Sequence, residues 1–309
     1  MSQNHYAQQL VLMDHIELAS MKSSDLLAEF QVSQYLSLLG GLSWLIQTRT
    51  DIAVYVCALQ RAAKSPKAEH ALRLNKVVKW AKRKPQQILY KRMRVPTRVM
   101  VISDSAFRKE DTKGLAMRGA LIGINELQEF SPAGVFHLLE FFARKQRRVT
   151  RSTYSAELNA ASDAFEFGKL IALTVSEIIK PYPSISSLMA LEERGEFGLP
   201  VQLAIDARSV FDSLRAHELK APTEISLIMF LCQLKEALLC HSLRTLWWVA
   251  TEDMLADALN KGACSRQKLL EFSRTGEWRL EKSAISHTEV RHVPILSQAQ
   301  LVLDPAKDG

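Results

Sequence analysis

Residues 201–219, VQLAIDARSVFDSLRAHEL, change from a strand pattern to a helix pattern at a single residue, Asp206. The apolar run 201–205 is typical of a short buried strand, and residues 207–219 predict a helix. Asp206 therefore lies where a strand ends, at the edge of a sheet where open α/β folds place their functional side chains. An Asp at a strand end is also a common start of a turn, so this segment alone leaves both interpretations open.

The alternation of strands and helices extends over most of the chain. Strands are predicted at residues 98–107 and 114–124, joined by a polar turn at 109–114, while residues 135–146 fit either a strand or a helix. Asp104 ends the apolar part of the first strand, as Asp206 does for its own. The remaining expected elements are helices at 151–179, 207–219 and 223–240, a strand at 243–250 and a helix from Thr251. The order β-β-β-α-β-α-α-β-α predicts an α/β fold in which helices cover a mixed sheet.

The chain before Pro96 has a different texture. Helices are predicted over residues 24–95, and the stretch between Pro85 and Pro96 fits a short strand or a linker. We therefore expect a small helical region at residues 1–95, an α/β domain at 97–275 and a C-terminal tail at 276–309.

Positive charge is concentrated near the end of the helical region. The 309 residues carry a net charge of +7, yet residues 61–98 hold thirteen Lys or Arg and one acid, Glu69. This concentration favours a polyanion surface, for a phosphate backbone, acidic protein or anionic lipid, over a solvated helix face, in which acids and bases normally alternate. The basic residues predicted to bind are Arg73, Lys76, Lys79 and Arg83, which share a helix face opposite the apolar residues Leu74, Val77, Val78 and Ala81, and Lys145, Arg147 and Arg148, which precede the helix at 151–179.

Composition argues against several classes of protein. The hydrophobic content of 47% is enough for a substantial core. Four widely spaced cysteines form no CxxC pair, so a zinc site or a disulfide framework is not expected. No leader pattern and no membrane-spanning run is present, and we expect a soluble intracellular protein of the cytoplasm or nucleus.

Glu157 is expected to face the protein interior. Its helical neighbours at three, four and seven residues are Ala160, Ala161 and Ala164. A carboxylate on such a face requires a cation or a hydrogen-bond partner. A metal ion could supply the charge, and so could an arginine from elsewhere, such as Arg151.

Asp257 has two possible roles. Glu252 and Asp253 suit the first turn of a helix that begins at Thr251, where negative charge is favourable, but Asp257 lies too far along for that effect. It can form a surface pair with Lys261, four residues on. It can also join Asp104, Glu157 and Asp206 in a carboxylate cluster. Four acids without neighbouring His or Cys suit Mg²⁺ or Mn²⁺, and two such ions about 4 Å apart can drive phosphodiester hydrolysis.

The motifs SDSAF, STYSAELNAA, LAIDARSVFDSL and WVATEDMLADALNKG resemble, in this order, the ribonuclease H domain of copia-type LTR retrotransposon Pol polyproteins. The upstream segment from QYLSLLGGLSW to KVVKWAKR is similar to the part that connects reverse transcriptase to that domain, so the resemblance covers residues 33–262. It implies a ribonuclease H-like mixed five-stranded sheet with flanking helices, preceded by a helical connection region. The metal-binding and catalytic acids it implies are Asp104, Glu157, Asp206 and Asp257. The chain departs from the family pattern at Ser105, Ala106, Phe107, Ser155 and Ala207.

The activity implied by this resemblance is Mg²⁺-dependent endonucleolytic hydrolysis of the RNA strand of RNA–DNA hybrids, with two Mg²⁺ ions for which Mn²⁺ substitutes. Expected partners are the hybrid or another nucleic acid, and the reverse transcriptase portion that the chain lacks. No adjacent Asp-Asp pair occurs in the sequence, so polymerase activity is not expected. The alternatives are a catalytically silent nucleic-acid-binding remnant of a retroelement and an unstable relic.

Overall fold

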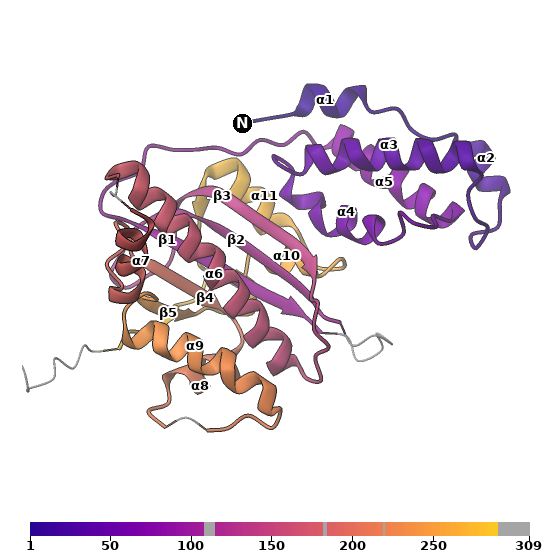
Figure 1. The fold of residues 1–309 in the computed structure, drawn as a ribbon. Helices are drawn as coiled ribbons and strands as arrows, with labels where there is room; N and C mark the ends of the chain where they lie inside the picture. Colours follow the sequence, from indigo (N-terminus) through magenta and orange to yellow (C-terminus); the bar gives the residue numbers. More distant parts are fainter. Residues whose placement is uncertain (108–114, 182–183, 219, 290–309) are drawn as a thin grey trace, which may run out of the picture.

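The structure, a computed structural model, describes residues 1–107, 115–181, 184–218 and 220–289 (Figure 1). The turn predicted at residues 109–114 and the tail beyond residue 289 lie outside the described residues. Val95–Pro96 is a cis peptide bond, at the boundary expected between the helical region and the α/β domain.

Residues 1–84 form helices around a core of their own, at the upper right of Figure 1. The predicted apolar face of the last of these helices is confirmed, because Leu74, Val77, Val78 and Ala81 are all buried. Residues 85–94 form no strand and act as a linker. The helices are α1 (Asn4–Gln9), α2 (His15–Ser20), α3 (Glu29–Leu45), the 3-10 helix η1 (Thr50–Ile52), α4 (Ala53–Gln60) and α5 (Ala68–Arg83).

The rest of the chain builds a mixed sheet with the strand order β6-β3-β2-β1-β4-β5-β7. Its central strands are β1 (Thr97–Ala106), β2 (Met117–Glu126), β3 (Gly134–Lys145), β4 (Val201–Ile205) and β5 (Thr245–Trp248). The segment that fitted either a strand or a helix is therefore a strand, β3. Strands β1, β2 and β3 pair antiparallel, while β4 and β5 run parallel to β1.

The expected α/β class is confirmed, but the expected strand number of five is wrong, because the sheet has seven strands. The two additional strands, β6 (Glu277–Trp278) and β7 (Ile285–His287), come from the segment assigned to the tail. They pair antiparallel with the outer strands β3 and β5 and so cover both edges of the sheet. Strands of two and three residues are too short to show an apolar alternation in the sequence.

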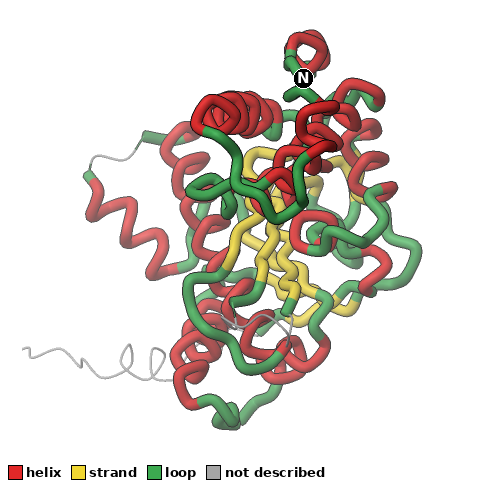
Figure 2. Tube along the Cα trace, turned by 90° about the vertical axis from the view of Figure 1, so that its right-hand side faces the viewer, coloured by secondary structure: helices red, strands yellow, loops and turns green. Residues whose placement is uncertain are grey.

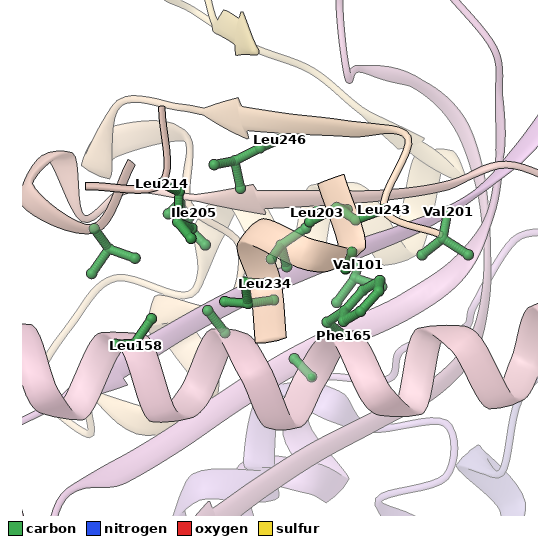
Figure 3. Close-up of a cluster of buried hydrophobic side chains, with 14 of the residues drawn as sticks. Val101, Leu158, Phe165, Val201, Leu203, Ile205, Leu214, Leu234, Leu243 and Leu246 are labelled. Carbon is green, nitrogen blue, oxygen red and sulfur yellow. The ribbon is translucent and has the colours of Figure 1, made fainter. Parts of the chain in front are cut away.

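Both faces of the sheet are covered by helices (Figure 2). Val99 and Val101 of β1 face one core, whereas Met100 and Ile102 face the other, and all four are fully buried. Figure 3 shows part of the first core, where Leu158 and Phe165 of the long helix meet Val101, Leu203 and Leu246. The helices after β3 are α6 (Thr153–Ile179), α7 (Ile185–Arg194), α8 (Arg208–Arg215), η2 (Ile225–Leu227), α9 (Ile228–Leu239), η3 (Thr251–Asp253), α10 (Asp257–Asn260) and α11 (Gln267–Thr275).

The long helix α6 lies close against β1 because it has a glycine at the contact. A Cβ atom added to Gly168 would lie 2.4 Å from Cγ2 of Val101, a distance at which atoms overlap. The absence of a side chain at Gly168 therefore sets the approach of α6 to the sheet, and with it the position of Glu157 near the start of that helix.

Candidate metal centre

Three carboxylates from separate elements meet at the edge of the sheet. Asp104 lies near the end of β1, and Asp206 directly follows β4, the parallel neighbour of β1. In the register of these strands Ile102 pairs with Ala204, so each acid lies two residues beyond this pair on its own strand. Glu157 comes from the first turns of α6, which crosses the same strands.

A carboxylate oxygen of each of the three residues Asp104, Glu157 and Asp206 lies within 4.8 Å of the others. Asp104 is 1% exposed and Glu157 6% exposed. The acids line a pocket of about 350 Å³ together with Ser105, Phe107, Thr153, Ala207, Ser209, Thr251 and Lys261. Oxygens bound to one Mg²⁺ lie about 2.1 Å from the ion and therefore at most about 4 Å from each other, so small side-chain rotations bring all three around a single ion. These residues could hold a metal ion.

Burial and mutual repulsion change the proton affinity of the cluster. Burial, and next the charge of Glu157, hold the pKa of Asp104 well above its usual range. Burial, and next the charge of Asp206, raise the pKa of Glu157 to about 8. Burial also raises the pKa of Asp206. Without a cation the cluster therefore retains protons at neutral pH, and a divalent cation would release them when it binds.

The two oxygens of Asp104 have different surroundings. Oδ2 accepts a hydrogen bond of 2.7 Å from Nδ2 of Asn260 and lies 3.2 Å from Nζ of Lys261. Oδ1 is buried and has no hydrogen-bond partner among the described residues. A buried carboxylate oxygen without a donor is costly unless a cation completes its surroundings. The oxygen-only donor set and this unpartnered atom both fit a hard divalent ion.

The alternative partner proposed for Glu157, Arg151, does not reach it. Arg151 is exposed, and its backbone N–H donates to Oγ of Ser155. Within the described part of the chain no ion pair joins Arg151 to Glu157. A protein cation for Glu157 is thus not provided by the arginine that the sequence offered.

Asp257 lies beside the three-carboxylate cluster but is not one of its members. Its Oδ1 is bonded to Nζ of Lys261, the predicted pair, and their side chains are 18% and 34% exposed. The pair is therefore half-buried, in contrast to the exposed pair expected from the sequence. Burial lowers the pKa of Lys261, but the charges of Asp104 and Asp257 outweigh this effect and raise it above its usual range. The structure thus brings together three of the four predicted acids and places a lysine between the fourth acid and Asp104.

The helix predicted from Thr251 is divided into η3 and α10, and the role expected for Asp253 is wrong. Asp253 is fully buried, and its Oδ1 lies 2.7 Å from Nζ of Lys268. It also accepts hydrogen bonds from the backbone N–H groups of Glu281 and Lys282. Asp253 therefore anchors the segment that leads to β7. No local pattern indicates this role, because the partners of Asp253 lie fifteen or more residues away.

A larger cleft of about 1820 Å³ lies between the helical region and α11. Two residues of the predicted basic helix face, Arg73 and Lys76, line it, and so does Lys145 of β3. The other two, Lys79 and Arg83, do not. Its lining, within the described residues, includes a single acid, Glu271, and six Lys or Arg residues: Arg61, Arg73, Lys76, Lys145, Arg266 and Arg274.

The sequence analysis missed three of these basic residues, Arg61, Arg266 and Arg274. Arg266 also joins the two walls, because its guanidinium lies 4.5 Å from the ring centroid of Tyr55 and donates to the backbone oxygen of Asp51. The remaining predicted residues lie elsewhere. Arg148 stacks over the ring of Phe230 at 4.7 Å, and Arg147 is exposed.

No protein-family model matches the chain, and no curated protein sequence matches it. Among the described residues, none of the helices combines the length and the apolar character that a bilayer crossing requires. The chemistry of the two sites is therefore the basis for any assignment of function.

Proposed function

We propose that the chain is a retrotransposon-derived, copia-type ribonuclease H that hydrolyses the RNA strand of RNA–DNA hybrids with Mg²⁺. The observation that carries this proposal is the cluster of Asp104, Glu157 and Asp206 at the edge of the sheet. The connectivity supports it as well. The central strands follow the order β3-β2-β1-β4-β5, with three antiparallel strands first and a long helix before β4, as the sequence resemblance implies for a ribonuclease H-like sheet.

The acids would hold the ion, and surrounding residues would orient them. When bound, divalent ions at such a site activate water and stabilise the leaving oxygen of a phosphodiester. Asn260 fixes Oδ2 of Asp104 by its 2.7 Å hydrogen bond, which leaves Oδ1 available as a ligand. The Thr251 side chain hydrogen-bonds to Asp206 and favours its charged form. The protein therefore supplies preoriented oxygens that require little rearrangement when a cation enters.

The basic cleft supports a nucleic-acid substrate. Its lysines and arginines come from α4, α5, β3 and the segment 264–274, and Cys264 of its lining lies three residues from Lys261 in the metal pocket. Phosphate backbones bind to such surfaces through charge, without regard to sequence. A hybrid held by this cleft would lie near the carboxylates.

The test is cleavage of end-labelled substrates by the purified chain in Mg²⁺. The proposal predicts internal cuts in the RNA strand of an RNA–DNA hybrid, and none in duplex DNA of the same sequence. Cleavage that persists in excess EDTA would contradict the metal mechanism. Equal cleavage of duplex DNA would contradict the substrate assignment.

The second candidate function is nucleic-acid binding without turnover, as a retained remnant of a retroelement. The cleft favours it, because its lining includes none of the three clustered carboxylates and binding there does not require a metal. Salt-dependent binding of hybrid in EDTA, combined with no Mg²⁺-dependent cleavage, would select this alternative.

A further inference from the structure

The ammonium group of Lys261 lies between two carboxylates that belong to different elements. Its Nζ is 3.2 Å from Oδ2 of Asp104 on β1 and is bonded to Oδ1 of Asp257 at the start of α10. Lys261 also lines the metal pocket together with Asp104, Glu157 and Asp206. Asp257 does not line this pocket.

The carboxylates around Asp104 define two cation positions. The first is the cluster of Asp104, Glu157 and Asp206, whose oxygens converge within 4.8 Å. The second lies between Asp104 and Asp257. Asp104 belongs to both positions, as the shared ligand of a two-ion phosphodiesterase site would. The second position is where Nζ of Lys261 lies.

We propose that Lys261 is a built-in cation that occupies the second cation position, so that the free chain binds a single divalent ion, in the cluster of Asp104, Glu157 and Asp206. This inference rests on the proposed metal site and specifies its loading. A second divalent ion binds only when the side chain of Lys261 is removed or leaves.

The local structure supports a lysine that is held but able to move. Its backbone N–H donates to the carbonyl oxygen of Asp257, which fixes the start of the side chain at the end of α10. The side chain is 34% exposed, so its charged end can reach solvent without opening the core. Asn260 also bonds to Oδ2 of Asp104, and this contact keeps Asp104 oriented when Lys261 is changed.

The inference is tested by counting bound Mn²⁺ on the purified chain, without nucleic acid, by electron paramagnetic resonance of the free ion. The expected result is one Mn²⁺ for the wild type and two for Lys261→Met. Lys261→Arg retains the positive charge and should bind one. Lys282→Met, which removes an exposed lysine paired with Glu252, is the matched control and should also bind one. Adding Asp257→Asn to Lys261→Met should return the count to one. Circular dichroism of each variant checks that it is folded.

Two outcomes would overturn the inference, and they are distinguishable from each other. Equal counts of one or of two in the wild type and in folded Lys261→Met would show that Lys261 does not hold the second position, while the metal site itself would stand. No bound Mn²⁺ in either protein would remove the proposed metal site and this inference with it.

Discussion

Replacement of Glu157 by glutamine should stabilise the metal-free protein at neutral pH. In the folded chain the pKa of Glu157 is about 8, compared with about 4.5 when exposed. Below pH 4.5 the carboxyl group is protonated in both the folded and the unfolded state, and its contribution to stability is fully present. Between pH 4.5 and 8 only the unfolded state loses the proton, so the free energy of unfolding falls as the pH rises.

The size of this effect follows from the same difference in pKa. Each pH unit within the window costs about 1.4 kcal/mol, so the wild type at pH 7 should have lost on the order of 3 kcal/mol relative to pH 4.5. The amide that replaces the carboxyl group in Glu157→Gln does not titrate, and it would not repel the neighbouring acids. We expect Glu157→Gln to match the wild type near pH 5 and to exceed it at pH 7 by on the order of 3 kcal/mol.

The assay is urea denaturation in EDTA at pH 5 and pH 7, followed by circular dichroism. Glu252→Gln is the control, because Glu252 is exposed and its pKa is lowered by the hydrogen bond to Lys282. This variant should not show the gain at pH 7. Added Mg²⁺ should stabilise the wild type and have a smaller effect on Glu157→Gln. The reasoning is refuted if wild-type stability is constant between pH 5 and 7, or if Glu157→Gln is less stable at both values.

Three further predictions concern other parts of the molecule. Asp257→Asn should lower Mg²⁺-dependent cleavage at least about tenfold, while changing the free energy of unfolding by less than about 1 kcal/mol, because loss of the Lys261 pair is offset by weaker repulsion of Asp104; unchanged cleavage would remove Asp257 from the site. Lys76→Ala should reduce the salt dependence of hybrid binding, by up to about one unit of slope per phosphate contact, whereas Lys79→Ala, outside the cleft lining, should not; equal slopes in filter-binding titrations would show that the cleft does not hold the backbone. Gly168→Ala should destabilise the chain by about 1–3 kcal/mol in urea denaturation, because its Cβ would overlap Val101, and a stable variant would show that α6 moves away from β1 at little cost.

The elements that position the site could be predicted where the sequence shows a local pattern. Asp104 and Asp206 each follow an apolar strand, and the parallel pairing of β1 with β4 brings them to one edge. Glu157 could be identified because only alanines follow it on its face of the helix, and it is buried. Periodicity and small neighbours are properties of the chain within a few residues, and the sequence displays them directly.

Features that depend on distant contacts could not be predicted. The partner of Asp253 is Lys268, and no spacing rule joins them. Lys261 was predicted to pair with Asp257 four residues earlier, but its contact with Asp104 joins segments that are far apart in the chain. The second wall of the basic cleft, with Arg266 and Arg274, becomes visible only when the helical region packs beside α11. Strands β6 and β7 are defined by the edges they cover and not by their own sequence.

The central claim is that the carboxylate cluster hydrolyses RNA paired with DNA. The most direct test compares the wild type with Asp104→Asn on an end-labelled RNA–DNA hybrid in Mg²⁺, because Asp104 belongs to both cation positions and its side chain keeps its shape in the variant. We predict internal cleavage of the RNA by the wild type and none by a folded Asp104→Asn that still binds the hybrid. Equal cleavage by both proteins, or no cleavage by a wild type shown to bind Mn²⁺ and hybrid, would contradict the claim.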